Sequence, residues 1–342
     1  MSTSSVLVAM SGGVDSSVAA ALLLDQGHEV VGVTLKLWGG ETDSGCCSVA
    51  DVEDARRVAS QLGIDHYVFN FTDEFTRSVV DSYVAAYADG RTPNPCVECN
   101  RSIKFGRLVE RADRMGFDRV ATGHHARVAR GQRGYELRRG IDVAKDQSYV
   151  CYMLGQRELA RAMLPIGELS KTEVRGHARS LGLRTADKAE SMDVCFVRRE
   201  DRVEFVTRRV GTRPGAVVDT AGSVLGTHEG VVKFTVGQRR GLGVQTGSPR
   251  YVVDVDAATA TVTVGSRADL LRSHVELDQL AFTNGAPSSI GLHAQTRAHG
   301  SPVEATLRGN HVEFASPQPR VAPGQVVALY DGDVLVGGGL AA

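Results

Sequence analysis

The feature that most constrains the fold is an apolar run that ends in two adjacent glycines. The run Val6-Leu7-Val8-Ala9-Met10 is typical of a buried strand, and the stretch from Val18 to Leu24 predicts an amphipathic helix. Between them stands Ser11-Gly12-Gly13-Val14-Asp15-Ser16-Ser17. Paired glycines let the backbone turn tightly toward a ligand, and a helix N-terminus offers unpaired N–H donors and partial positive charge. The sequence therefore predicts a strand, a turn and a helix that together bind phosphate.

The composition of this turn excludes two common phosphate loops. It lacks the Lys-Ser/Thr ending of the Walker loop and the glycine spacing of the dinucleotide-binding loop. A plain turn capped by Asp15 or Ser16 is the simpler alternative. The string SGGVDSS resembles the PP-loop of the ATP pyrophosphatases, which cleave ATP between the α and β phosphates and adenylate a substrate. The resemblance implies transfer of AMP and a Mg²⁺-dependent ATP site.

The chain from residue 5 to about 125 alternates short apolar runs with longer helical periods. Strands are predicted at Val6–Met10, Val30–Leu37, Tyr67–Phe71 and Arg119–Thr122. Helices are predicted near Ser16–Gln26, Ala50–Leu62, Asp73–Ala88 and Ile103–Met115. This alternation indicates an α/β fold with a doubly wound parallel sheet, whose ligand lies beyond the carboxyl ends of the strands. A hairpin near Val128–Leu137 follows, and helical segments at Gln147–Met163 and Lys171–Leu181 extend this domain.

After about residue 210 the pattern changes to short alternating runs between Gly, Asp, Asn and Pro turns. The runs are Arg250–Val255, Thr261–Val264, Val303–Leu307 and Val326–Tyr330. The segment Thr283–Ile290 either links two β-rich pieces or belongs to a loop. We therefore expect a PP-loop ATP-binding catalytic domain with a helical extension over residues 1–208. A small β-rich central domain over 209–272 and a C-terminal β-barrel-like domain over 273–342 follow it.

Charge and hydropathy narrow the cellular context. The net charge of −1 gives no global field toward nucleic acid, so any RNA contact must use local basic patches. No run approaches the roughly 20 apolar residues needed to span a bilayer, and the first residues are not those of a leader. We expect a cytoplasmic protein without membrane contact. Six cysteines in 342 residues, two of them spaced Cys-x-x-Cys, favour thiol or metal chemistry over a disulfide framework.

The Cys-x-x-Cys pair lies in Asn94-Pro95-Cys96-Val97-Glu98-Cys99-Asn100, where the prolines disfavour helix. The next amphipathic run starts near Asn100, so Cys99 is expected at a loop-to-helix junction. The helix N-terminus and nearby Arg101 or Lys104 would lower the pKa of its thiol and enrich the nucleophilic thiolate. The alternative is a pair of small buried apolar side chains. A third cysteine, Cys195, follows Ser191-Met192-Asp193-Val194 and by itself is typical of a core position.

Several spaced motifs occur in the order found in the tRNA-specific 2-thiouridylase family, which the chain resembles over essentially its whole length. These motifs are SGGVDSS, NPCVECNRSIKF, Ala121-Thr122-Gly123-His124, Lys145-Asp146-Gln147-Ser148-Tyr149, the region of Cys195, and Phe234-Thr235-Val236-Gly237-Gln238-Arg239-Arg240-Gly241-Leu242. The resemblance implies ATP-dependent 2-thiolation of the wobble uridine of tRNA. ATP converts the C2 oxygen into an AMP leaving group, which a sulfur nucleophile replaces.

The resemblance also implies roles for individual residues. Cys195 would receive sulfur as a persulfide from a cysteine desulfurase or sulfur-relay protein, and Cys99 would help to release it, leaving a disulfide. The ATP-binding residues would be Ala9, Met10, Ser11, Gly12, Gly13, Val14, Asp15, Ser16, Leu35 and Gly123. The tRNA-binding residues would be Asn94, Pro95, Cys96, His124, Lys145, Asp146, Gln147, Arg297 and Gln325.

One departure from the family pattern opens a second mechanism. Many relatives carry Asp where this chain has Cys96, so Cys96, Cys99 and Cys195 could instead ligate three irons of a four-iron four-sulfur cluster. His124-His125 has no ligand-spaced partner, so we predict no zinc site. Other functions compatible with the loop are a PP-loop ligase acting on a small metabolite and an ATP-responsive iron–sulfur or RNA-binding protein without turnover.

Three further groups have less defined roles in the sequence. Cys46-Cys47 and Cys151 receive no catalytic assignment. Arg239 and Arg240 are either ordinary surface charges or phosphate contacts in a glycine-flanked loop. A basic helical series is either a solvated face or an RNA-binding patch. Its members are Arg101, Lys104, Arg107, Arg111 and Arg114.

Overall fold

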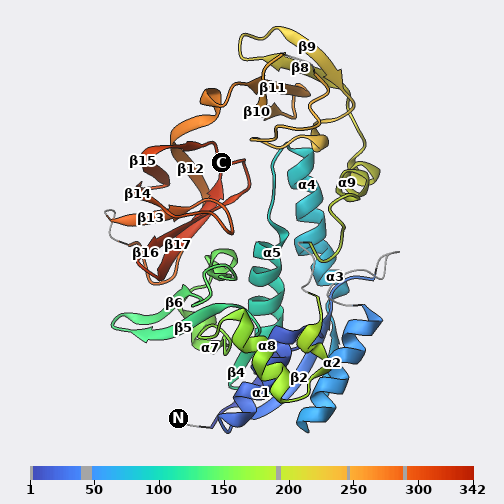
Figure 1. The fold of residues 1–342 in the computed structure, drawn as a ribbon, viewed down its shortest axis with the longest axis vertical. Coiled ribbons are helices and arrows are strands. Elements are labelled where there is room, and N and C mark those ends of the chain that lie inside the picture. The colour runs from blue at the N-terminus through green and yellow to red at the C-terminus, as the bar shows by residue number, and fades with distance from the viewer. Residues whose placement is uncertain (1–2, 40–47, 190–193, 245–246, 288–290) are drawn as a thin grey trace.

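The computed structural model describes residues 3–39, 48–189, 194–244, 247–287 and 291–342. A parallel α/β unit forms one end of the elongated molecule, a small mixed sheet forms the other end, and a β-barrel lies beside the helices between them (Figure 1). The predicted fold class, a doubly wound parallel sheet followed by β-rich units, is confirmed. Among the described residues, no helix has both the length and the apolarity to cross a bilayer.

The parallel sheet has five strands in the order β3-β2-β1-β4-β7. Their bounds are β1 Ser5–Ala9, β2 Glu29–Lys36, β3 His66–Asn70, β4 Arg119–Thr122 and β7 Ala162–Met163. The central strand β1 pairs with both β2 and β4, with Ala9 opposite Val33 on one side and Thr122 on the other. The loops that follow β1 and β4 therefore emerge side by side at the carboxyl edge.

Helices cover both faces of this sheet, because β1 is apolar on both sides. Val6 and Val8 are fully buried in one core with α1 Val14–Asp25, α2 Val49–Leu62 and α8 Lys171–Ser180. Leu7 faces a second core, which includes residues of six further helices. Those helices are α3 Thr72–Phe75, η1 Thr76–Val80, α4 Asp81–Ala88, η2 Cys99–Arg107, α6 Leu108–Arg114 and α9 Arg202–Val210. The short helix α5 Pro95–Glu98, which leads into η2, packs its Val97 in a third core instead.

Two local predictions are wrong. The predicted helix Gln147–Met163 is instead a 3₁₀ turn η3 at Ser148–Cys151, a short helix α7 at Gln156–Arg161 and the edge strand β7, whose Ala162 pairs with Val120. The helix expected to start near Asn100 starts at Pro95, because the Asn94 side chain accepts the Cys96 N–H at 3.1 Å and proline suits the first helical position. Cys99 therefore lies one turn inside a continuous helix rather than at its start.

Two β-rich units follow α9. The small sheet has the order β10-β11-β8-β9, with η5 and η6 beside it. The bounds are β8 Gly215–Asp219, β9 Val224–His228, η5 Val231–Lys233, β10 Tyr251–Asp256, β11 Thr261–Gly265 and η6 Ala268–Leu270. The barrel has six antiparallel strands, closed by pairing of β12 with β17. Its strands are β12 Leu271–Phe282, β13 Leu292–Gln295, β14 Val303–Arg308, β15 His311–Pro319, β16 Val326–Asp331 and β17 Val334–Ala341.

The hairpin after β4 and the loop after β12 belong to the barrel, which the local sequence pattern does not predict. Strands β5 Ala126–Gly131 and β6 Gly134–Arg139 form the predicted hairpin, and β6 pairs with β17, so the hairpin extends the barrel sheet. Residues 283–287 connect β12 to β13 within the same barrel, so they form a loop and not a link between units. The rest of that predicted segment, 288–290, lies outside the described residues.

Candidate active site

A cavity of about 350 Å³ opens at the carboxyl edge of the parallel sheet. The loop after β1, the end of β2, the loop after β4 and the first turns of the α5–η2 helix all contribute to its walls. Residues of the predicted ATP site that line it are Ala9, Met10, Ser11, Gly13, Val14, Asp15, Ser16, Leu35 and Gly123. The cavity therefore lies where a doubly wound sheet binds its ligand.

The loop after β1 holds its shape through its glycines and hydroxyls. Gly12 has φ +72°, and a Cβ there would lie 2.2 Å from the carbonyl oxygen of Asp51, so only glycine fits without moving backbone. The Ser16 hydroxyl accepts the Ser11 N–H at 3.1 Å, and the Ser17 hydroxyl donates to the Gly13 carbonyl at 2.8 Å. The loop thus wraps the N-terminus of α1, with its partial positive charge toward the cavity.

Gly123 brings the loop after β4 into direct contact with the loop after β1. A Cβ at Gly123 would lie 2.6 Å from the Ser16 nitrogen and 2.7 Å from the Asp15 carbonyl carbon. Glycine at this position therefore permits the two loops to form one continuous wall.

Asp15 is held by two cationic or cation-capable groups. Lys171 Nζ lies 2.7 Å from both carboxylate oxygens, and His125 Nε2 lies 3.3 Å from Oδ1. Burial raises the pKa of Asp15, but the hydrogen bonds from His125 and Lys171 outweigh it and leave the pKa below its ordinary value. Asp15 is therefore an ionised, positioned carboxylate, as a Mg²⁺ ligand beside nucleotide phosphates must be.

Two lysines at this site were missed by the sequence reasoning. Lys171 is the first residue of α8, where the helix dipole disfavours a cation, and that misplaced charge is the signal that could have identified it. Lys188 Nζ contacts the Gly12 carbonyl at 2.9 Å, Asp51 at 2.6 Å and Asp54 at 2.7 Å. Lys188 therefore ties the glycine loop to the N-terminal part of α2, a contact across 176 residues that no local pattern indicates.

The three cysteines singled out above line the same cavity. Cys99 is buried, and Cys96 and Cys195 are half-buried; among the described cysteines, these three form no disulfide with one another. Cys195 is followed by Phe196, whose ring packs against Trp38, Phe75 and other aromatic rings and so fixes its position. Ser191-Met192-Asp193 of this motif, and Cys46-Cys47, lie outside the described residues.

Within the described ranges, no group of three or more His, Cys, Asp or Glu side chains is placed to hold a metal ion. The three thiols share the cavity wall but, in this arrangement, do not form a ligand set for a cluster.

Five of the predicted tRNA-binding residues also line the cavity: Pro95, Cys96, His124, Lys145 and Gln147. His124 is buried, with Nδ1 2.7 Å from the Thr122 hydroxyl and its ring beside Phe105. Burial lowers the pKa of His124 well below its ordinary value, so this side chain is neutral at physiological pH.

The other four have places outside the cavity wall. Asn94 caps the α5 helix. Asp146 is buried and accepts hydrogen bonds from Gly140, Ser148 and Arg139, which stabilises the chain around the motif. Gln325 donates to the Thr92 carbonyl at 2.6 Å and so joins the barrel to the segment that leads into Pro95. Arg297 is exposed on the barrel.

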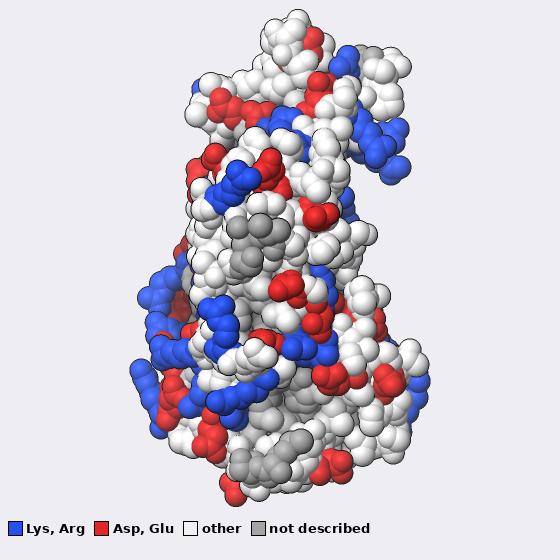
Figure 2. Space-filling model, turned by 90° about the vertical axis from the view of Figure 1, so that its left-hand side faces the viewer, with Lys and Arg blue, Asp and Glu red and all other residues white. Residues whose placement is uncertain are grey.

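Basic side chains gather on one face of the molecule, at the height of the β5–β6 hairpin (Figure 2). Carboxylates compensate the charges of three arginines of this hairpin: Arg127 and Arg138 contact Asp333, and Arg139 contacts Asp146. The helical series is also dispersed among partners, with Arg101 bonded to Gln279 and Tyr152, Arg107 paired with Glu110, and Arg111 over the ring of Phe69. Arginines whose charge is not balanced by a carboxylate partner are therefore better suited to bind phosphate than these.

Fold and cavity together define an α/β protein with a doubly wound sheet and a thiol-lined cavity at the carboxyl edge of that sheet, and comparison with known proteins specifies the family. Family models match residues 4–199 (tRNA methyl transferase HUP domain), 203–266 (tRNA methyl transferase PRC-barrel domain) and 272–341 (Aminomethyltransferase beta-barrel domain). The tRNA-specific 2-thiouridylase MnmA of Chloroflexus aurantiacus is 48% identical over 98% of this chain and 97% of its own length. That of Mycolicibacterium gilvum is 50% identical over 96% and 95%.

The chain belongs to the tRNA-specific 2-thiouridylase family. Among solved structures, it is similar to a U34-tRNA thiolase NcsA from Methanococcus maripaludis with its [4Fe-4S] cluster. The identity is 18%, with coverage of 61% of this chain and 64% of that one and a TM-score of 0.38, too low to support an inference about mechanism.

Proposed function

We propose that this protein catalyses ATP-dependent 2-thiolation of the wobble uridine of tRNA. The observation that carries the proposal is the shared cavity, whose lining includes the glycine loop with Asp15 and also Cys96, Cys99 and Cys195. Adenylation acts on the uridine O2 and sulfur transfer on the C2 atom bonded to it, so both sets of groups must reach one base. A base drawn out of its stack into such a cavity meets this requirement.

In the first step, the uridine O2 attacks the α-phosphorus of ATP and pyrophosphate leaves. The backbone donors of residues 11–16 and the N-terminus of α1 bind the phosphates. Asp15 would hold Mg²⁺, which neutralises phosphate charge when bound. Neutral His124, at the cavity wall, can donate or accept a hydrogen bond to the base without adding charge.

In the second step, the terminal sulfur of a Cys195 persulfide attacks C2 and AMP leaves with the former O2. The Cys99 thiolate then attacks the Cys195 Sγ, which breaks the persulfide S–S bond and leaves sulfur on the uridine as a thiocarbonyl. The two cysteines end as a disulfide, so an external dithiol must reduce them before the next turnover. A cysteine desulfurase or a sulfur-relay protein supplies the persulfide sulfur.

The decisive experiment is mass spectrometry of nucleosides from tRNA incubated with the protein, ATP, Mg²⁺ and a persulfide donor. We expect 2-thiouridine at the wobble position with wild-type protein, and none with Cys99→Ser or Cys195→Ser. Cys151→Ala is the matched control, because Cys151 is buried and burial raises the pKa of its thiol to about 12, which keeps it protonated. Absence of thiolated nucleoside with wild-type protein would refute the function.

Two alternatives are tested by the same variants. A ligase acting on a small metabolite would release pyrophosphate without tRNA, and a binding protein without turnover would release none. An iron–sulfur mechanism differs in its demand on Cys96, the third thiol of the cavity. We expect Cys96→Ser to retain substantial activity in iron-free protein; stoichiometric iron in anaerobically purified protein, lost together with activity in Cys96→Ser, would favour the cluster instead.

A further inference from the structure

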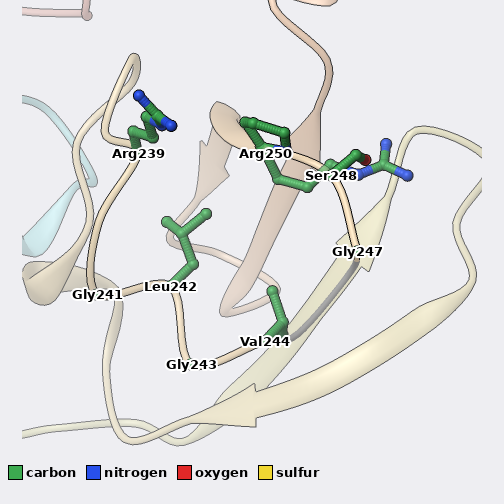
Figure 3. Close-up of a pocket in the computed structure, with 9 residues that line it drawn as sticks. Arg239, Gly241, Leu242, Gly243, Val244, Gly247, Ser248 and Arg250 are labelled. Carbon is green, nitrogen blue, oxygen red and sulfur yellow. The ribbon is translucent and has the colours of Figure 1, made fainter.

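Described residues of the loop before β10, between Arg239 and Val244 and between Gly247 and Arg250, line a second concavity, of about 620 Å³, in the unit that contains the small mixed sheet. Figure 3 shows Arg239 on one side of the loop, Leu242 and Val244 at its turn, and Ser248 and Arg250 on the other side. This concavity belongs to a different unit from the catalytic cavity, and no step of the reaction above uses it.

The described part of this loop is fixed to the sheet at its base. The Gly237 N–H donates to the Val252 carbonyl at 2.8 Å, and the Val252 N–H donates to the Gln238 carbonyl at 2.9 Å. Leu242 is buried in the same apolar cluster as Phe234, so its side chain anchors the turn from below. The polar groups of the loop are thus held outward by the apolar ones.

The backbone of the loop presents unused hydrogen-bond donors. Gly237, Gly241, Gly243 and Gly247 all have φ between +62° and +87°, the left-handed region that favours glycine. Within the described part of the chain, none of the peptide N–H groups of residues 239–244 donates to a protein acceptor. Successive peptide N–H groups in turns of this kind form anion-binding concavities.

Arg239 and Arg240 add positive charge that no carboxylate cancels. Both side chains are exposed, and neither forms an ion pair with any residue that the structure describes. Arg250 on the opposite side is partly compensated, because its charge acts on Asp269. This distinguishes the loop from the β5–β6 hairpin, where Arg127 and Arg138 contact Asp333.

The position of the loop relates it to the catalytic cavity. The small sheet lies at the opposite end of the molecule from the parallel sheet (Figure 1). Near the base of the loop, the Thr235 hydroxyl lies 3.4 Å from the hydroxyl of Thr92, and the chain runs from Thr92 directly to Pro95 and Cys96 at the cavity. A polyanion that starts at the cavity and follows this side of the molecule reaches the loop.

We propose that residues 237–244 of this loop bind backbone phosphates of a tRNA stem remote from the wobble base, through Arg239, Arg240 and the unused peptide donors. This inference rests on the proposed function, since it assumes that the catalytic substrate is tRNA. The contact carries no base specificity, because phosphates position an RNA without reading its sequence. It makes the enzyme favour a complete tRNA over an isolated anticodon stem–loop.

The test compares the affinities of full-length tRNA and a 17-nucleotide anticodon stem–loop for wild-type protein and Arg239→Ala/Arg240→Ala. We expect the double variant to bind full-length tRNA about tenfold more weakly, with the slope of log affinity against log salt reduced by about 1.4 to 1.8. Binding and thiolation of the stem–loop should be unchanged. Arg57→Ala, an exposed arginine on α2, is the control and should match wild type.

Equal binding of full-length tRNA by variant and wild type would overturn the proposal, as would equal loss for both RNAs. Binding of inorganic phosphate to wild-type protein and to the double variant tests whether the loop is a site for free anions instead. If the double variant loses phosphate binding but keeps its affinity for tRNA, the proposal is also wrong. Failure of the proposed function is separate, because then wild-type protein thiolates neither RNA.

Discussion

At the scale of single residues, Asp15 shows how a largely buried carboxylate is kept ionised. It lies in the first turn of α1, where the helix dipole favours negative charge, and two hydrogen-bond donors outweigh the cost of its burial. The carboxylate remains ionised well below neutral pH and is available to a metal ion. Cys151 is the opposite case, because burial raises the pKa of its thiol, outweighs the charge of Lys104 and keeps the thiol protonated.

We predict that Asp15→Asn reduces tRNA-dependent pyrophosphate release by about 10²- to 10³-fold, the range typical for loss of a group that stabilises charge in a transition state. The amide preserves shape, so the thermal unfolding midpoint should stay close to that of wild type. Asp25→Asn, at the exposed end of α1, is the matched control. Pyrophosphate release by Asp15→Asn at the wild-type rate would remove Asp15 from the ATP site.

Ser16 allows a second prediction, because its hydroxyl shapes the loop from within. It accepts the Ser11 N–H at 3.1 Å and donates to the Gly13 carbonyl at 3.2 Å. Ser16→Ala removes both bonds, so we expect weaker ATP binding and loss of pyrophosphate release while the parallel sheet remains folded. Equilibrium binding of a fluorescent ATP analogue, with circular dichroism as the folding control, measures this. An unchanged dissociation constant would contradict it.

At the scale of elements, the N-terminus of α8 carries a conflict that the fold resolves through Asp15. A lysine as the first helical residue opposes the dipole, yet Lys171 is only 12% exposed and contacts both carboxylate oxygens of Asp15. The capping box of Ser170 and Glu173 fixes this end of the helix and so aims the ammonium at the site. Helix α8 thus supplies the positive charge that balances the Asp15 carboxylate.

We predict that Lys171→Met moves the acidic limb of the pyrophosphate-release profile to higher pH. The Asp15 pKa is depressed in the folded protein, so the ionised carboxylate persists above that pKa and is lost as pH falls through it. Without the Lys171 ammonium, fewer interactions oppose the effect of burial on Asp15, so the pKa of Asp15 rises. Rates measured between pH 4 and 8 test this; Arg179→Gln on the exposed face of α8 is the control. An unshifted limb would exclude Lys171 from tuning Asp15.

The elements also show how far sequence reasoning reaches. Strand β4 was predicted with its observed bounds, because an apolar run between turn residues is a local signal. Strand β7 was predicted as helix, since only pairing with β4 makes Ala162 and Met163 a strand. The glycine loop was evident from its composition, whereas Lys188 was not, because its partners at Gly12, Asp51 and Asp54 are brought together only by the fold.

At the scale of the whole molecule, the segment of residues 91–93 joins all three units. The Thr92 N–H donates to the Pro323 carbonyl of the barrel at 2.7 Å, and Gln325 donates to the Thr92 carbonyl. The Thr92 hydroxyl also reaches Thr235 beside the small sheet. Since the next residues cap and begin the helix that carries Cys96 and Cys99, the barrel and the small sheet position the thiols from outside the catalytic unit.

The whole molecule must also bind a polyanion with a net charge of only −1. Local basic groups decide such binding, because each phosphate that they neutralise releases counterions. We therefore predict that tRNA affinity falls steeply between 50 and 200 mM salt. Lys145→Ala should weaken binding and reduce the slope of log affinity against log salt by about 0.7 to 0.9, since Lys145 lines the catalytic cavity.

Filter binding or fluorescence anisotropy over this salt range gives both quantities, with Arg57→Ala as the control for loss of one distant surface charge. The Lys145 variant should lose affinity for the isolated anticodon stem–loop as well as for full-length tRNA, because the cavity receives the wobble base in both. If the variant loses affinity for full-length tRNA alone, Lys145 contacts a part of the tRNA outside the anticodon stem–loop instead. Affinity that does not change with salt would contradict phosphate-driven binding altogether and would favour a small metabolite as the substrate of the catalytic cavity.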